Sequence, residues 1–267
     1  MLRTENRPAV GRETVKFNAV QDEMMSESTT TKRAATRIDA ILETAEALFM
    51  EKGYDATSMR DIAKAVGIAK GTLYHHFASK LDLLDAVVQR RSRAVLATFE
   101  PLINDSTIDA PSKLRLLFLQ GNQWKIEHRD FILSIAKVMY RPENAIWREQ
   151  IYRTALEMEA PLLSAIIRQG VDEGHFDVED PEATAPIVLT MAREFSDAFA
   201  RALLANDHTP ETVRWLHRKA RAYERSMERV LGMPVGTLHL NLETIVSAWF
   251  PDHLSETEEA HQSTQRS

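Results

Sequence analysis

The segment Thr57–Lys80, TSMRDIAKAVGIAKGTLYHHFASK, limits what this 267-residue chain can fold into more than any other segment does. Apolar residues recur at helical spacing on both sides of Gly67. Ser58 and Asp61 have the spacing of a capping box, which starts a helix. Glycine adopts the left-handed conformation that ends one helix and turns the chain toward the next. The pattern therefore predicts two short helices joined by a tight turn, a helix-turn-helix.

The second helix of this pair is expected to begin near Ala69. Leu73 and Phe77 lie four residues apart, so both are predicted to pack inward. The remaining surface carries hydrogen-bond donors and flat rings rather than core fillers: Lys70, Thr72, Tyr74, His75 and His76. In a helix-turn-helix the first residues of the second helix enter the major groove of DNA, so Lys70 and Thr72 are predicted to reach base edges.

Other residues of the segment are suited to the phosphate backbone. Tyr74, His75, His76 and Lys80 are predicted to donate to phosphate oxygens. Ser58 places a helix N-terminus where it can meet a phosphate, and Arg60 is the residue of the first helix predicted to reach a base. A solvated histidine pair and an ordinary half-buried tyrosine would explain some of these residues taken singly. Their combination with the glycine turn favours DNA binding.

From about Arg37 to about Arg93 the chain resembles the TetR family of bacterial transcription regulators. The resemblance is carried by Ile41, Ala45, Leu48, Phe49, Gly53, Tyr54, Thr57, Ile62, Ala63, Gly67, Lys70, Gly71, Thr72, Leu73, Tyr74, Phe77, Lys80 and Leu84. It implies that a first helix packs over the pair, that Gly71 belongs to the DNA-binding set, and that a lysine matching Lys80 pins a fourth helix to phosphate. Ala69 departs from the pattern, because many relatives have Ser or Thr there to cap the second helix.

Charge is distributed unevenly along the chain, whose formal net charge is -6. Between Lys32 and Glu100 eleven Lys and Arg face nine Asp and Glu, whereas Pro101–Ser267 carries eighteen against twenty-five. A mildly basic head on an acidic body argues against nonspecific nucleic-acid binding and favours a few placed contacts.

The rest of the chain predicts an all-α protein with an N-terminal helix-turn-helix head and a C-terminal helical body for ligand binding and dimerisation. We expect a disordered arm over residues 1–31, a DNA-binding domain over 32–80, a helical effector-binding and dimerisation domain over 81–250, in which 81–100 is a connecting helix, and a polar tail over 251–267. The expected helices after Lys80–Phe99 are Ser112–Glu127, Asp130–Tyr140, Glu143–Glu173, Pro181–Ala205 and Glu211–Leu231. Pro161 is expected to interrupt or kink the third of these five. Thr237–Phe250 fits either a strand or a short helix, and we favour the helix.

The family resemblance implies that Pro181–Ala205 and Glu211–Leu231 form a four-helix bundle with a second copy. Plain packing within one chain would explain the same apolar residues. Two heads about one DNA turn apart are needed to read a palindromic operator in double-stranded DNA, so we expect a homodimer.

All four tryptophans lie outside the head, and the body is rich in aromatic residues and methionine. This composition suggests an apolar interior that binds a small hydrophobic effector, although such residues line plain cores more often than pockets. The residues expected to line the pocket are Trp124, His128, Met139, Tyr140, Trp147, Tyr152, Met191 and Phe195. An effector that prefers one spacing of the heads would weaken DNA binding by the same coupling.

Nothing in the sequence predicts an enzyme, a cofactor or a metal site. Motifs such as HExxH, GxSxG and a phosphate-cradling glycine loop are missing from the chain, and it has no cysteine. No long apolar run is present to span a membrane, and a cytoplasmic location is expected. Two alternatives remain: an effector-independent architectural DNA-binding protein on the same fold, and a helical interaction protein that does not bind DNA.

Overall fold

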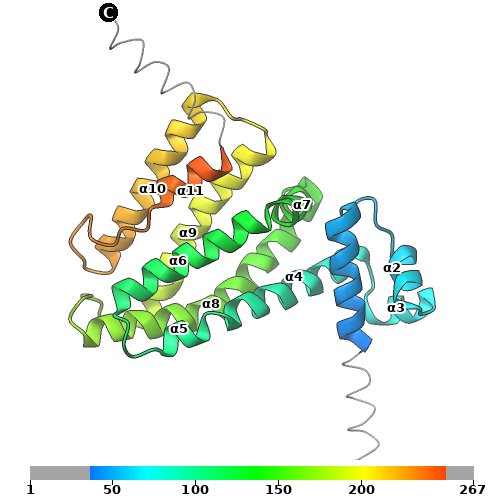
Figure 1. Cartoon of the computed structure of the whole chain (residues 1–267), viewed down its shortest axis with the longest axis horizontal. Helices are drawn as coiled ribbons and strands as arrows, with labels where there is room; N and C mark the ends of the chain where they lie inside the picture. The colour runs from blue at the N-terminus through cyan, green and yellow to red at the C-terminus, as the bar shows by residue number, and fades with distance from the viewer. Residues whose placement is uncertain (1–36, 251–267) are drawn as a thin grey trace, which may run out of the picture. The chain divides into compact units, whose positions relative to one another are not determined.

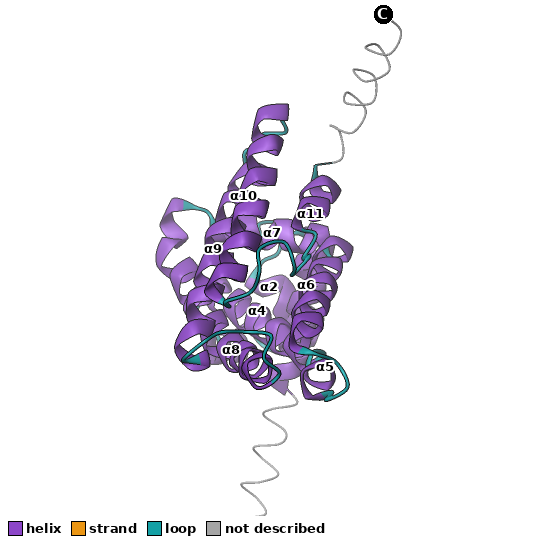
Figure 2. Cartoon of the chain, turned by 90° about the vertical axis from the view of Figure 1, so that its left-hand side faces the viewer, coloured by secondary structure: helices purple, strands orange, loops and turns teal. Residues whose placement is uncertain are grey.

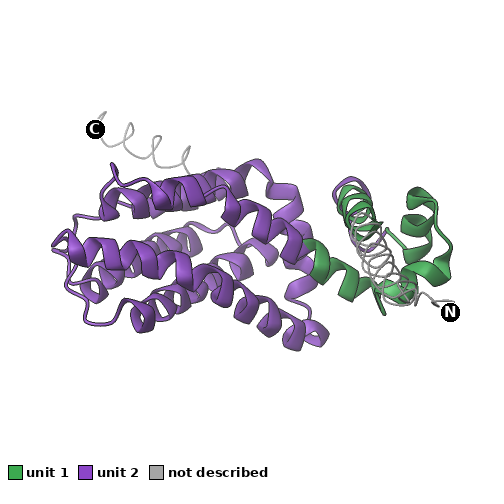
Figure 3. Ribbon diagram, turned by 90° about the horizontal axis from the view of Figure 1, so that it is seen from below, with its two compact units in different colours: residues 1–48, 57–87 green, residues 49–56, 88–267 purple. Residues whose placement is uncertain are grey.

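The computed structural model describes residues 37–250, so the predicted arm and polar tail lie outside the described residues. Within this range every regular element is a helix and no strand occurs, which confirms the all-α class (Figure 2). None of the helices in the described range is long and apolar enough to cross a membrane. The chain divides into two compact units, of which the first contains residues 57–87 and the part of the chain up to Leu48 (Figure 3). The second contains Phe49–Ala56 and the described residues from Val88 to Phe250.

The first unit is built from short helices around a small apolar core. A helix over residues 37–52 precedes α2 (Met59–Val66) and α3 (Lys70–His76), and α4 (Lys80–Ala97) begins in this unit and continues into the second. Each helix contributes fully buried side chains to the core, namely Ile41, Ala45, Ile62, Leu73, Leu83 and Val87. The predicted apolar stripe of the first helix is therefore confirmed.

The second unit is a stack of longer helices (Figure 1). In chain order these are α5 (Glu100–Asn104), α6 (Ala110–Glu127), α7 (Arg129–Met139), the 3-10 turn η1 (Pro142–Asn144), α8 (Ala145–Asp172), α9 (Pro181–Leu204), α10 (Pro210–Val230) and α11 (Leu242–Trp249). The most extensive packing is between α8 and α9. Helix α10 packs on both α9 and α11, and α6 packs on α8.

Three of these helices begin with the same N-terminal cap followed by proline. Asp109, Asp180 and Thr209 each accept a hydrogen bond from a backbone N–H of the first turn, and a proline follows each at the start of the helix. Proline fits this position because its missing N–H would have had no partner within the helix. The predicted helix from Pro181 therefore begins where expected.

Pro161 was predicted to interrupt or kink its helix. Helix α8 runs through Pro161 without interruption, so that part of the prediction is wrong. An internal proline costs a helix about 3 kcal/mol, and the long packing of α8 against α9 and α6 outweighs that cost. Pro101 lies in the first turn of α5, after α4 has ended at Ala97.

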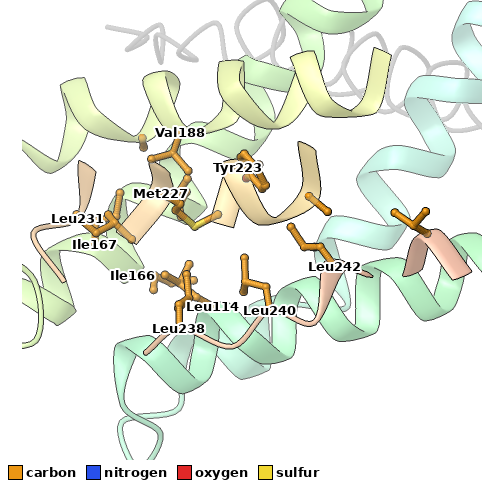
Figure 4. Close-up of a cluster of buried hydrophobic side chains, with 14 of the residues drawn as sticks. Leu114, Ile166, Ile167, Val188, Tyr223, Met227, Leu231, Leu238, Leu240 and Leu242 are labelled. Atoms are coloured by element: carbon orange, nitrogen blue, oxygen red, sulfur yellow. The ribbon is translucent and has the colours of Figure 1, made fainter. Parts of the chain in front are cut away.

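The core of the second unit lies where α6, α8, α9 and α10 meet (Figure 4). Leu114 from α6, Ile166 and Ile167 from α8, and Met227 from α10 are all at most 1% exposed. Leu238 and Leu240 reach the same cluster from the segment before α11, and Leu242 reaches it from the first residue of α11. These alternating leucines gave the sequence its strand-like pattern, but the expected short helix forms, from Leu242 to Trp249.

Two glutamates of α10 replace the hydrogen bonds that a strand would have needed. Glu228 is fully buried and accepts from the backbone N–H groups of Gly236, Thr237 and Leu238, each at 2.8 Å. Glu224 accepts from the backbone N–H of Leu240 at 2.7 Å. These bonds hold an irregular segment in which His239 and Asn241 have positive φ, 54° and 55°, while Leu238 and Leu240 are buried.

Candidate nucleic-acid interface

The start of α2 is fixed by a complete capping box. The Ser58 hydroxyl accepts from the backbone N–H of Asp61 at 3.2 Å, and an Asp61 carboxylate oxygen accepts from the backbone N–H of Ser58 at 3.0 Å. The same carboxylate oxygen accepts from the Ser58 hydroxyl at 2.6 Å. The predicted capping box is confirmed, and both side chains remain exposed at the surface.

The turn between α2 and α3 depends on glycine. Gly67 has φ 77° and ψ 32°, in the left-handed region that a side chain makes costly, and its N–H donates to the last turn of α2. Helix α3 then begins after Ala69, whose side chain makes no cap, as expected from the sequence. Leu73 is fully buried and anchors this short helix to the core of the unit. Phe77, half-buried, follows the last residue of α3.

Folding leaves most of the predicted DNA-contacting residues at the surface. Arg60 of α2 and Lys70, Gly71, Tyr74 and His75 of α3 are exposed, whereas Thr72, His76 and Lys80 are half-buried. The ammonium group of Lys70 lies 5.4 Å from the centre of the Tyr74 ring, within the range of a cation–π contact. The Tyr74 side chain is 43% exposed, more than a tyrosine that served only the core would be.

Thr57 has a structural role that the sequence did not reveal. It is 1% exposed, and its hydroxyl donates to the backbone carbonyl of Leu48 at 3.2 Å. The Lys80 ammonium group donates to the Thr57 carbonyl at 2.9 Å. Thr57 thus joins the first helix to the segment before α2 and to the start of α4. The only sequence signal for this role was a polar residue just before a capping box.

The charge of this segment suits a polyanion. Residues 57–80 contain four Lys and Arg against one aspartate, and the carboxylate of that aspartate is used in the cap. This surplus is small, so electrostatic attraction to phosphate would assist binding rather than supply all of it.

Comparison with known proteins decides the family. The model of "Bacterial regulatory proteins, tetR family" matches residues 41–87, and that of "Tetracyclin repressor-like, C-terminal domain" matches residues 125–202. The HTH-type transcriptional repressor KstR2 of Mycobacterium tuberculosis is 32% identical over 145 residues, which cover 53% of this chain and 70% of that protein. The chain belongs to the TetR family.

Solved structures of this family share the fold. A TetR-family transcriptional regulator from Pectobacterium atrosepticum is 22% identical, with a TM-score of 0.55 over 76% of this chain and 98% of that one. A TetR transcription regulator from Haloarcula marismortui is 19% identical, with a TM-score of 0.52 over 74% of this chain and 97% of that one. The TetR-family assignment and the helix-turn-helix together identify the chain as a DNA-binding transcriptional regulator.

The residues predicted to line an effector pocket fall into separate groups in the TetR-family body. Trp124 stacks on His128 with ring centres 4.4 Å apart, and the Arg91 guanidinium lies 5.2 Å from the Trp124 ring. Trp147 is buried. Phe195 lies parallel to Tyr223 of α10, with ring centres 6.0 Å apart. Met139 ends α7, and Met191 is half-buried on α9.

Tyr140 and Tyr152 converge on one carboxylate. Their hydroxyls are 2.9 Å apart, and both donate to the same oxygen of Asp197, from Tyr140 at 2.5 Å. Burial and these hydrogen bonds to Asp197 raise the pKa of Tyr140, and they raise the pKa of Tyr152 to about 12. The Arg193 guanidinium lies 4.1 Å from the Tyr152 ring centre. Because these groups satisfy one another, this cluster joins α7, α8 and α9 through polar contacts.

A separate open groove lies beside α8 and α9. Its volume is about 380 Å³, and its lining is Glu157, Ala160, Pro161, Ser164, Arg168 and Glu182. An ion pair between Arg168 and Glu182 crosses from α8 to α9. This lining shares no residue with the predicted effector set.

Proposed function

We propose that two copies of this chain bind a twofold-symmetric operator as a repressor, and that a small hydrophobic molecule releases them from DNA. Sequence-specific DNA binding is supported by the outer surface of α3, where Lys70 and Tyr74 are exposed. Leu73 on the opposite side of this helix is buried and anchors it to the core. Repression is supported by the similarity to a transcriptional repressor of M. tuberculosis.

Each predicted contact follows from the chemistry of its side chain. Lys70 and Thr72 at the start of α3, with Arg60 on α2, read base edges. Tyr74, His75 and His76 donate to phosphate oxygens, and the Ser58 end of α2 faces another phosphate. The Lys80 ammonium group, which donates to the Thr57 carbonyl, also donates to a phosphate oxygen when DNA is bound. Gly71 lets the α3 backbone approach DNA closely.

The DNA assignment is tested on duplexes selected from a random library by the full-length protein. Lys70→Ala combined with Tyr74→Ala should lower affinity for the selected site at least 30-fold, because a base contact and a phosphate contact are both lost. The slope of log affinity against log salt should fall with it. Lys64→Ala removes an exposed charge of α2 outside the predicted set and is the matched control. Equal affinity of the double variant and this control would rule out α3 as the reading helix.

Dimerisation through α9 and α10 is supported by apolar groups that the single chain leaves uncovered. Ile187 on α9 is 53% exposed and Trp215 on α10 is 38% exposed. We expect Ile187→Asp combined with Trp215→Asp to shift the protein to monomer in sedimentation velocity and to abolish operator binding. Ile146→Asp is the control, since Ile146 is 77% exposed on α8, outside the proposed bundle. A double variant that stays dimeric would refute this interface.

A further inference from the structure

The open groove beside α8 and α9 is built mainly from one face of α8. Its lining residues from this helix recur three and four positions apart, the spacing of a single helix face: Glu157, Ala160, Pro161, Ser164 and Arg168. Glu182 joins the lining from α9, where it forms an ion pair with Arg168. The groove volume of about 380 Å³ lies at the lower end of the range for small-molecule sites.

Pro161 gives this groove a backbone acceptor that most helix faces lack. In an α-helix the carbonyl of Glu157 would accept from the backbone N–H at position 161, four residues later. Proline has no N–H, and its ring displaces the carbonyl four residues before it. Pro161 lies inside α8, and both Glu157 and Pro161 line the groove. The Glu157 carbonyl, without its α-helical donor, therefore lies at the groove wall.

Ser164 adds a second acceptor. This residue lines the groove although it is only 6% exposed. Its hydroxyl donates to the Ala160 carbonyl at 2.8 Å. A hydroxyl oxygen can also accept, and no donor among residues 37–250 reaches this one. A buried oxygen of this kind is a place where a bound molecule supplies the missing hydrogen bond.

The charges of the lining leave one carboxylate over. Arg168 and Glu182 neutralise each other in their ion pair. The exposed Glu157 side chain forms neither a hydrogen bond nor an ion pair with any of residues 37–250. The groove therefore offers three acceptors, two uncharged and one anionic. Both of its side-chain donors, on Ser164 and Arg168, are already engaged.

We infer that this groove binds a small primary ammonium compound with a short apolar body. An ammonium group carries three N–H donors and one positive charge. These match the Ser164 hydroxyl, the Glu157 carbonyl and the Glu157 carboxylate, the last through a charge-assisted hydrogen bond. Ala160 and Pro161 provide apolar contact beside them. The site is separate from the effector response proposed above, and its test requires no DNA.

Four probes that share one ring separate the ligand classes: benzylammonium, benzyltrimethylammonium, benzyl alcohol and benzoate. Benzyltrimethylammonium keeps the charge but has no N–H donor, benzyl alcohol keeps one donor but no charge, and benzoate carries the opposite charge. In calorimetric titrations of the full-length protein, benzylammonium should bind about tenfold more tightly than the other three, because each of them loses at least two hydrogen bonds. Its affinity should fall as salt rises, because Glu157 is exposed.

Three substitutions test the acceptors one at a time. Pro161→Ala restores the N–H that bonds the Glu157 carbonyl within the helix, Ser164→Ala removes the hydroxyl, and Glu157→Gln removes the charge. Each should weaken benzylammonium binding about 3- to 10-fold, the usual worth of one hydrogen bond. Because Pro161→Ala replaces an internal proline, its loss of affinity cannot come from a weakened α8.

Pro186→Ala and Glu143→Gln are the matched controls. Pro186 is the internal proline of α9 and Glu143 is an exposed residue of η1, and neither lines the groove. Both variants should bind benzylammonium as the wild type does. Equal losses in Pro161→Ala and Pro186→Ala would refute the Glu157 carbonyl as a contact.

The same titrations can overturn the inference as a whole. Benzoate or benzyltrimethylammonium binding as tightly as benzylammonium would refute the primary ammonium class. Displacement of benzylammonium by magnesium ions at constant ionic strength would refute it in favour of a metal. Unchanged affinity in all three lining variants would refute the site, as would the failure of benzylammonium to bind.

Discussion

The hydrogen bonds within the two units of this protein span different distances along the chain. In the first, α2 and its turn depend on bonds between residues three or four positions apart, as in the Ser58–Asp61 box and the Gly67 turn, and Lys80 adds one bond to Thr57, 23 positions away. In the second, Lys113 donates to Gln169, 56 positions away, and the backbone N–H of Ala110 donates to Glu173, 63 positions away. Local bonds repeat in sequence patterns, whereas distant bonds leave almost no pattern.

The largest effect that would test this comparison is expected at Glu228. Glu228→Ala removes the acceptor of three backbone N–H groups, of which that of Leu238 is buried, and should cost the second unit about 2–4 kcal/mol. All four tryptophans lie in this unit, so urea unfolding followed by their fluorescence reports on it alone.

Two other glutamates of α10 provide a graded comparison. Glu224→Ala, which removes the acceptor of one amide, should cost less, and Glu211→Ala at the exposed start of α10 should cost least. If Glu228→Ala cost no more than Glu211→Ala, the distant bonds would not hold this unit together.

The same contrast explains how much could be read from the sequence. The capping box, the left-handed Gly67 and the uncapped Ala69 were predicted correctly, because each depends on its own residue type and near neighbours. Pro161 was misjudged because the packing of α8 on α9 is not encoded in its immediate neighbours. Leucines at 238, 240 and 242 gave a strand pattern, but the amides of Leu238 and Leu240 pair with side chains of a helix rather than with a neighbouring strand.

The candidate sites divide in the same way. Exposure of Lys70 and Tyr74 followed from helical spacing around Leu73. The role of Thr57 could not be predicted, because it depends on the contacts that Thr57 makes with Leu48 and Lys80 in the folded chain. Tyr140 and Tyr152 were expected to line a pocket, and the structure shows that both donate to Asp197.

Two glycines within helices test the same comparison, with expected effects of intermediate size. A Cβ atom at Gly170 would lie 2.1 Å from the buried ring of Phe176, whereas one at Gly71 would meet nothing within 4 Å. Gly170→Ala should destabilise the second unit by about 1–3 kcal/mol through overpacking. Gly71→Ala should leave stability unchanged or raise it by up to about 1 kcal/mol, since alanine favours helix.

The two glycine variants should rank in the opposite order for DNA affinity, with the larger loss in Gly71→Ala. Gly71→Ala places a methyl group on the proposed reading surface and should weaken binding to the selected duplex about tenfold. Gly170→Ala should bind normally at temperatures where it is folded. Calorimetric unfolding and fluorescence anisotropy measure the two effects. Loss of stability in Gly71→Ala would show that this glycine serves the fold rather than DNA.

The smallest expected effect is the pH dependence of stability that the carboxylates at the start of α6 provide. The first turn of α6 is held by two carboxylates: Asp109 accepts from the Ser112 backbone N–H at 2.7 Å and Glu173 from that of Ala110 at 2.9 Å. These hydrogen bonds lower the pKa of both groups. A depressed folded pKa gives stability that is present above the unfolded value, about 3.9 for Asp and 4.3 for Glu, and is lost as pH falls through the folded value. The Ser58 hydroxyl at the start of α2 does not titrate in acid. The hydrogen bond that it accepts from the Asp61 backbone N–H therefore persists at low pH.

Asp109→Asn combined with Glu173→Gln keeps an accepting oxygen at both positions at every pH. Between pH 5 and about pH 3 the wild-type second unit should therefore lose slightly more stability than the double variant, by a fraction of 1 kcal/mol because both carboxylates are exposed to solvent. Urea unfolding at a series of pH values, read by tryptophan fluorescence, measures the difference. Parallel stability curves for the two proteins would show that these caps contribute no pH dependence, and a steeper curve for the variant would reverse the sign assigned to them.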